Sequence, residues 1–174
     1  MDSDIKIFGE QEHQDDLERV AAQTEALRES GDLDRAKDLG RELAALAVKG
    51  PELISLAESF GFKLTPAREH QLQMLMVFSG QSALQEILPQ LLGEAAVTAM
   101  NNFLINHARE FWDTISDGSA FTQYRLTEDC SGMGEVFARV CKQEDNCDLH
   151  QLGTTVFNAA HELVAAKWGL PKET

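Results

Sequence analysis

Apolar residues recur at steps of three and four along most of this chain, and glycine or proline interrupts the pattern at intervals. The last such stretch carries a stripe formed by Leu149, Leu152, Val156, Phe157, Ala160, Leu163 and Val164. This spacing follows the 3.6-residue period of an α-helix, whereas a half-buried strand would alternate every second residue. The sequence therefore predicts an all-α fold, a compact bundle of about six to eight helices with no β-sheet.

Glycine and proline stops divide the chain into its predicted helices. We expect helices over about 15–29, 33–49, 51–60, 66–78, 82–113, 134–143 and 148–168, with a break at Pro89 and an irregular connection over 114–128. Thr65 and Asp148 are the predicted N-caps of the helices that begin there, and Gly169 is the predicted stop of the last helix. The segment beyond Pro89 is the predicted central helix, because it belongs to the longest predicted helical stretch, 82–113, and its apolar stripe is close to heptad spacing. A length of 174 residues suits one domain. Residues 1–13 are a predicted disordered polar tail, and 14–174 a single helical domain.

The chain is acidic, and much of its acidity lies near the N-terminus. The formal net charge is −14, and residues 1–34 contain 11 acidic and 3 basic residues. Such a surface repels phosphate backbones and anionic membranes, so we expect neither direct nucleic-acid binding nor membrane association. The acidic segment is interpreted either as a solvated surface or as a docking surface for a basic partner.

The N-terminus shows no secretory signal, because a basic segment followed by an apolar one is missing. No apolar run approaches the roughly 20 residues that span a bilayer. The chain has three cysteines, an odd number that suits free thiols in a reducing compartment. The expected location is therefore the cytoplasm.

Three cysteines and one histidine form the pattern closest to a metal site. Cys130, Cys141, Cys147 and His150 follow the spacing C-x10-C-x5-C-x2-H. Three thiolates with one imidazole form a known structural zinc set, so a zinc site is one hypothesis. The opposing interpretation is that the cysteines are unrelated, because close C-x2-C pairs are missing and Cys141 falls on an apolar helix face. We expect no cofactor.

The histidines suggest one further candidate site. His107 lies on the apolar stripe beyond Pro89, near Glu110, and His161 lies on the last predicted helix. One interpretation is a core histidine that is hydrogen-bonded by a neighbour. The alternative is a ligand pocket lined by His107, Glu110 and His161, since helical bundles hold sites between facing helices. His161-Glu162 lacks the second histidine of a zinc-protease HExxH motif, and no residue is assigned as catalytic.

Two segments resemble parts of known families. The stretch EALRESGDLDRAKDLGRELAALA (25–47) resembles one hairpin of a tetratricopeptide repeat, but no second copy occurs at the period of about 34 residues. The stretch PELISLAESFGFKLTPAREHQL (51–72) resembles the helix-turn-helix of bacterial leader peptides of the nitrogen-fixation-associated type, which is presented to a peptide-modifying enzyme. The double-glycine cleavage site of that family is absent. We therefore expect ordinary helical hairpins here and transfer no function.

Without a catalytic motif, the sequence favours a non-enzymatic protein-protein interaction or regulatory module. Its partner would be an unidentified protein with a basic surface. One alternative is an acidic nucleic-acid mimic that inhibits a DNA- or RNA-binding protein. Another is a small-ligand-binding or catalytic bundle. The heptad-like stripes suit either the core of a monomer or the seam of a homodimer.

Overall fold

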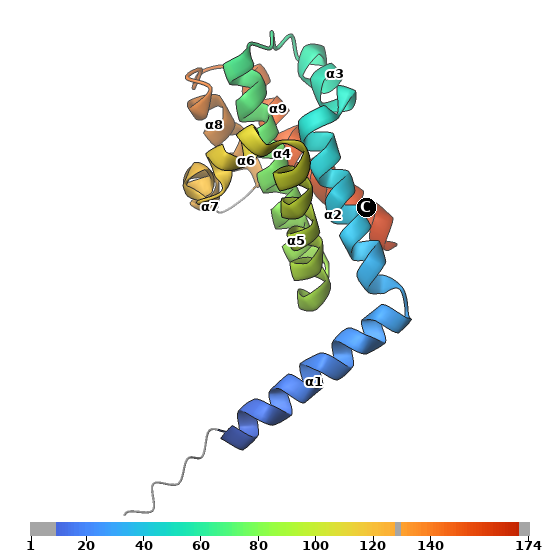
Figure 1. Cartoon of the computed structure of the whole chain (residues 1–174). Coiled ribbons are helices and arrows are strands. Elements are labelled where there is room, and N and C mark those ends of the chain that lie inside the picture. Colours follow the sequence, from blue (N-terminus) through green and yellow to red (C-terminus); the bar gives the residue numbers. More distant parts are fainter. Residues whose placement is uncertain (1–9, 128–129, 171–174) are drawn as a thin grey trace, which may run out of the picture. The chain divides into compact units, whose positions relative to one another are not determined.

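The computed structural model describes residues 10–127 and 130–170, and the side chains of 17–127 and 132–170. Within these residues the chain is helical and has no strand. Figure 1 shows the helices in sequence colours: α1 (Glu10–Glu29), α2 (Asp32–Lys49), α3 (Pro51–Ser59), α4 (Pro66–Ile87), α5 (Gln90–His107), α6 (Arg109–Ile115), η1 (Ser119–Phe121), α7 (Thr122–Arg125), α8 (Cys130–Val140) and α9 (Cys147–Trp168). The predicted all-α class is confirmed.

The described residues contain nine α-helices, slightly more than the six to eight expected. The additional elements are short: α6 separates from α5 at Ala108, and the four-residue α7 lies in the segment predicted as irregular. Pro89 does break the chain, because Leu88 takes an extended conformation immediately before it.

The chain divides into two compact units, Met1–Arg35 and Ala36–Thr174. The first contains α1 and the opening turn of α2. The predicted tail over 1–13 lies mostly outside the described residues, which begin with α1 at Glu10. The second unit holds the hydrophobic core, which is formed mainly by α2, α4, α5, α8 and α9.

The helix with the largest number of buried residues is α4, which packs against both α9 and α5. Its buried residues are distributed around much of its circumference: Leu72, Met74, Leu75, Met76, Val77, Ser79, Gly80, Ala83 and Leu84. The prediction that the helix beyond Pro89 is central was therefore wrong, as was the predicted end near Ser79. A helix buried on several sides has no single apolar stripe, so its sequence pattern does not mark it as central.

Glycines allow two pairs of helices to approach closely. A Cβ atom on Gly40 of α2 would overlap the carbonyl oxygen of Ala96 in α5. A Cβ atom on Gly134 of α8 would overlap the carbonyl oxygen of His150 in α9, and one on Gly153 would lie 2.8 Å from Phe137 Cβ. Backbone contact of this kind needs residues without side chains, and it sets the separation of each pair.

Polar caps define where two helices begin. The Thr65 hydroxyl accepts a hydrogen bond from the Arg68 backbone N–H at 3.4 Å, as the sequence predicts. At the start of α9 the Asn146 side-chain oxygen accepts from the backbone N–H groups of Asp148 and Leu149, at 3.1 and 3.2 Å. The cap of α9 is thus Asn146, two residues before the predicted Asp148.

Candidate functional site

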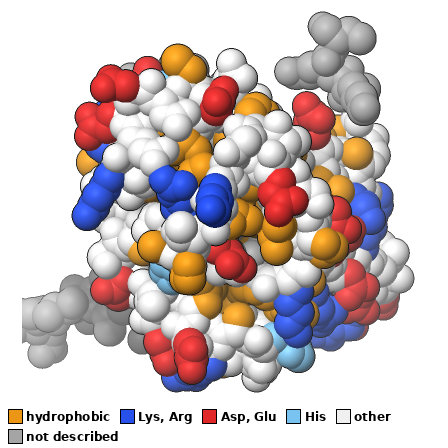
Figure 2. All heavy atoms as spheres, turned by 90° about the horizontal axis from the view of Figure 1, so that it is seen from above, with side chains coloured by type: hydrophobic (Ala, Val, Ile, Leu, Met, Phe, Trp, Pro, Cys, Tyr) orange, Lys and Arg blue, Asp and Glu red, His pale blue; other side chains and the backbone are white. Residues whose placement is uncertain are grey.

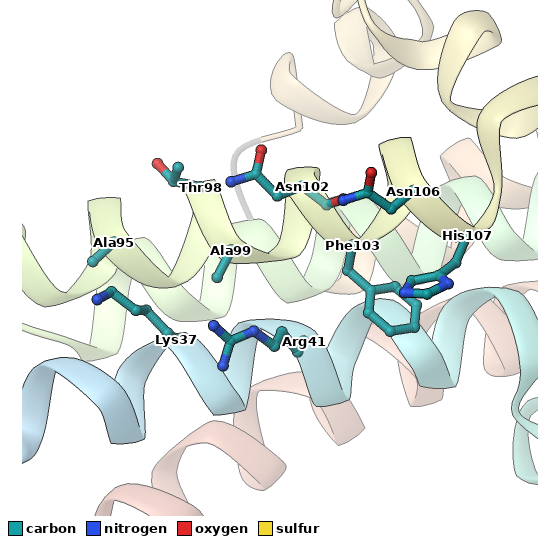
Figure 3. A pocket seen from close by; sticks show the side chains of 9 residues that line it. All are labelled: Lys37, Arg41, Ala95, Thr98, Ala99, Asn102, Phe103, Asn106 and His107. Carbon is teal, nitrogen blue, oxygen red and sulfur yellow. The ribbon is translucent and has the colours of Figure 1, made fainter.

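A groove of about 470 Å³ runs along the seam between α2 and α5. Figure 3 shows the residues that line it: Lys37, Arg41, Ala95, Thr98, Ala99, Asn102, Phe103, Asn106 and His107. All of them belong to the unit from Ala36 onward. The polar lining residues all carry groups that can donate hydrogen bonds, and none of the lining residues is acidic.

The α2 wall of the groove carries two cations one helical turn apart. Leu39, Leu43 and Ala44 face the core and fix the rotation of α2. This rotation places Lys37 and Arg41 at the edge of the seam beside α5 (Figure 3). The close approach of the two helices, which the glycine of α2 permits, keeps these side chains near the opposite wall.

The α5 wall combines a floor of small side chains with a polar rim. Ala95 and Ala99 form the floor, and a rim of three polar residues at four-residue spacing runs along the helix: Thr98, Asn102 and Asn106. The Asn106 amide donates to the Asn102 backbone carbonyl at 2.8 Å. Its side-chain oxygen therefore stays able to accept a hydrogen bond, so the rim has both donors and acceptors.

An aromatic pair lies at one end of the groove. The rings of Phe103 and His107 have centroids 4.4 Å apart at an interplanar angle of 45°. Phe103 is half-buried and His107, the last residue of α5, is exposed. The apolar stripe predicted a core position for His107, but α5 ends at this residue, and its ring lies at the rim of the groove.

The positive charge of the groove is local and modest. Arg41 Nη1 pairs with Asp38 Oδ1 on the same helix, and the Arg41 side chain is 52% exposed. Asp38 thus offsets the charge that Arg41 supplies. On the face shown in Figure 2, basic and acidic side chains are interspersed among apolar ones. Because Asp38 offsets the charge of Arg41, the groove suits a ligand of low negative charge better than a polyanion.

The three residues of the predicted pocket, His107, Glu110 and His161, lie in different surroundings. His107 lines the α2–α5 groove, whereas Glu110 is exposed in the first turn of α6. His161 Nδ1 donates to the Phe157 carbonyl at 3.0 Å, and its Nε2 lies 3.2 Å from Glu86 Oε2 of α4. The contacts of His161 are thus with α4 and α9, and those of His107 with the groove.

The cysteine pattern is only partly covered by the described side chains. Cys141 is half-buried, Cys147 is exposed, and the Cys130 side chain lies outside the described residues. His150 Nε2 lies 2.6 Å from the Glu144 carbonyl oxygen, so this nitrogen donates a hydrogen bond. Among the described side chains, no three His, Cys, Asp or Glu groups are placed to share a metal ion. The zinc site stays a prediction.

Most of the groove has no signal in the sequence. Lys37, Arg41, Asn102 and Asn106 each look like ordinary polar residues on helix surfaces, and the four-residue spacing within each pair is the one visible signal. Only the packing of α2 on α5 brings the two pairs together.

The other candidate surface is α1, taken by itself. Its apolar stripe is open, since Leu17 is 67% and Val20 is 41% exposed, and Leu27 is half-buried. Residues 10–29 contain seven acidic residues and two arginines. Glu25 pairs with Arg28 at 2.6 Å, one turn along the helix. This helix presents apolar side chains bordered by carboxylates.

No protein-family model, no curated protein and no solved structure matches this chain. By its fold and its groove, the chain is an all-α bundle with a polar groove between two helices that approach closely at a glycine. None of the described helices is both long enough and apolar enough to cross a membrane.

Proposed function

We propose that this chain is a non-enzymatic protein-interaction module whose helix α1 docks on a basic partner protein. The observation that carries the proposal is the open stripe on α1, where Leu17 and Val20 are exposed in a helix rich in carboxylates. Burying a Leu or Val side chain contributes roughly 1.5–3 kcal/mol when the burial is complete. The stripe therefore offers a substantial gain to any partner that covers it.

The acidic border of the stripe favours a partner of opposite charge. Glu18, Glu25 and Glu29 are all exposed. Lysine and arginine side chains on a partner would complement these carboxylates, raise the rate of association and make binding sensitive to salt. Most of the stability of a helix in a protein comes from the packing of its apolar face, so packing on a partner would also stabilise α1 itself.

The cysteine content bears on the cellular compartment of the protein. Three cysteines suit a reducing compartment, and we propose a cytoplasmic protein on that basis. The module would act as a monomer or a homodimer.

The test is a pull-down from a lysate of the encoding organism, with elution in steps of increasing salt, followed by binding measurements with the purified partner. Replacing Leu17 and Val20 by Gln should weaken that binding at least about tenfold. The substitutions remove at least about 1.4 kcal/mol of apolar burial from the interface, and a loss of that size corresponds to a tenfold weaker affinity. Leu126→Gln is the matched control, since Leu126 is 79% exposed and lies outside α1. The Leu126→Gln variant should bind the partner with the affinity of the wild type.

Charge reversal tests the electrostatic part separately. Glu18→Lys with Glu25→Lys should weaken binding and reduce its dependence on salt, whereas Glu52→Lys with Glu58→Lys on α3 should leave both unchanged. A partner held equally by all variants and at all salt concentrations would exclude this role for α1. A partner that DNA or RNA displaces from the chain would instead support the nucleic-acid mimic.

A further inference from the structure

We propose that the groove between α2 and α5 binds an extended peptide carrying two acidic side chains two residues apart, of the form Asp/Glu-x-Asp/Glu. The proposal is independent of the one for α1, because every lining residue belongs to the unit from Ala36 onward. It depends on three features of the groove: the spacing of its cations, the spacing of its amides and its modest charge.

The cations of the α2 wall match the repeat of an extended peptide. Lys37 and Arg41 are four residues apart on a helix, a separation of about 6 Å along the axis. Alternate side chains of an extended peptide point to the same side and are about 6.6–6.8 Å apart. Two carboxylates at positions i and i+2 can therefore reach the two cations together, and adjacent carboxylates cannot, because they point to opposite sides.

The polar rim of α5 matches the same repeat. Thr98, Asn102 and Asn106 are spaced by four residues, so successive polar side chains also follow one another at about 6 Å. An amide side chain has both a donor and an acceptor, and it can pair with a peptide group of the ligand. In an extended peptide, groups that face the same side recur every second residue. The rim can thus hold the backbone of the ligand while α2 holds its carboxylates.

The size of the groove agrees with a short peptide segment. Its volume of about 470 Å³ lies within the roughly 300–1,000 Å³ of typical ligand sites. Thr98 and Asn106 are eight residues apart, which corresponds to about 12 Å along α5. A segment of about four extended residues covers that length.

The modest charge of the groove favours a peptide with two carboxylates over nucleotides and nucleic acids. The carboxylate of Asp38 pairs with Arg41, and the chain as a whole carries −14. Nucleotides and nucleic acids would bring several negative charges against that background. A peptide with two carboxylates brings fewer, and it can take Arg41 from Asp38 because their pair is exposed and contributes little to stability.

The test uses the full chain and a fluorescein-labelled peptide, acetyl-Ser-Gly-Glu-Ala-Glu-Gly-Ser-amide, followed by fluorescence anisotropy at low ionic strength. Two further peptides control for charge and spacing, one with Gln-Ala-Gln and one with adjacent Glu-Glu at the centre. We expect the Glu-Ala-Glu peptide to bind at least about tenfold more tightly than either control. ATP and inorganic phosphate serve as unlabelled competitors and should displace it poorly.

Matched variants then locate the site. Lys37→Gln with Arg41→Gln should weaken peptide binding at least about tenfold, and Asn102→Ala with Asn106→Ala about fivefold or more. Lys49→Gln with Arg139→Gln removes the same charge from exposed positions outside the groove and should change binding less than about twofold. Circular dichroism and thermal unfolding of each variant establish that it is folded.

Three results would overturn the proposal. The first is equal binding of the Glu-Ala-Glu, Gln-Ala-Gln and Glu-Glu peptides. The second is a folded Lys37→Gln/Arg41→Gln variant that binds the peptide as the wild type does. The third is displacement of the labelled peptide by ATP or phosphate at lower concentrations than the unlabelled Glu-Ala-Glu peptide requires. That result would assign the groove to phosphate compounds.

Discussion

Gly40 of α2 lies against the backbone carbonyl of Ala96 in α5, with no space for a side chain between them. This contact brings the two helices together at backbone distance and aligns the cations of one with the polar rim of the other. The groove along the seam is a consequence of that approach. One glycine therefore links the packing of the core to the candidate binding site.

Replacing Gly40 by Ala should destabilise the protein by at least about 2 kcal/mol, because a Cβ atom would overlap the Ala96 carbonyl and force the helices apart. The control is Gly80→Ala, whose Cβ would lie 3.2 Å from the flexible Met100 Cε atom. Its cost should be within about 1 kcal/mol, since alanine also has the better helix propensity. Urea unfolding measures both. Equal stabilities of the two variants would contradict the close contact.

Replacing Asn146 by Ala should cost about 1 kcal/mol of stability, because its side-chain oxygen caps two backbone N–H groups of α9. Asp148→Ala should cost less, since Asp148 is exposed in the first turn, where a carboxylate gains a modest interaction with the helix dipole. Urea unfolding of the two variants decides whether Asn146, as in the structure, or Asp148, as predicted from the sequence, caps α9. A larger cost for Asp148→Ala would favour Asp148 as the cap.

Tyr124 is predicted to tolerate loss of its hydroxyl. The residue is 1% exposed, its ring stacks on Phe78, and its phenol oxygen has no hydrogen-bond partner among the described residues. Tyr124→Phe should therefore be neutral or stabilising by up to about 1 kcal/mol, whereas Tyr124→Ala should cost about 3 kcal/mol or more. Thermal unfolding measures both, and a large loss in Tyr124→Phe would reveal a partner for the hydroxyl.

The same residue should affect stability at high pH. Burial raises the pKa of Tyr124 above its ordinary value of 10.0 in the folded state. The unfolded chain consequently ionises first, and the wild type should lose stability as the pH rises above about 10. Other groups titrate in this range too, so the relevant quantity is the difference between wild type and Tyr124→Phe. That difference should change in favour of the variant as the pH increases.

The two cysteines with described side chains should differ in reactivity. Burial raises the pKa of the Cys141 thiol to about 11, and this residue is half-buried, whereas Cys147 is exposed. Because the thiolate is the reactive form, iodoacetamide at pH 8 should modify Cys141 at least about tenfold more slowly than Cys147. Site-resolved mass spectrometry measures the rates. The difference should vanish in urea, and equal rates in the folded protein would contradict the burial of Cys141.

His107 and His161 should behave differently in peptide binding. His107→Ala removes a ring at the rim of the α2–α5 groove and should weaken binding of the Glu-Ala-Glu peptide about twofold to fivefold. His161→Ala should leave binding unchanged, because its contacts are with Glu86 and Phe157. Anisotropy titrations measure both. Equal losses in the two variants would support the pocket predicted from the sequence, in which both histidines take part.

Local patterns predicted the helical class and several helix ends correctly. Thr65 caps α4, Pro89 separates two helices, and Gly169 ends α9 in a left-handed conformation. Each of these features depends on a few neighbouring residues and on backbone geometry, which the sequence displays directly. The structure was less predictable where burial is nearly uniform, as around Ser79 and Gly80 in α4, because the apolar period is then weak.

By itself, the sequence determined the helical class, the acidity of the N-terminal segment and the breaks at glycine and proline. Only the tertiary structure decided which helix is central and which polar residues line one groove. Lys37 and Asn102 are far apart in the chain, and nothing local relates them. Both line the groove because Gly40 of α2 contacts the backbone of Ala96 in α5, and this contact exists only once the two helices are packed.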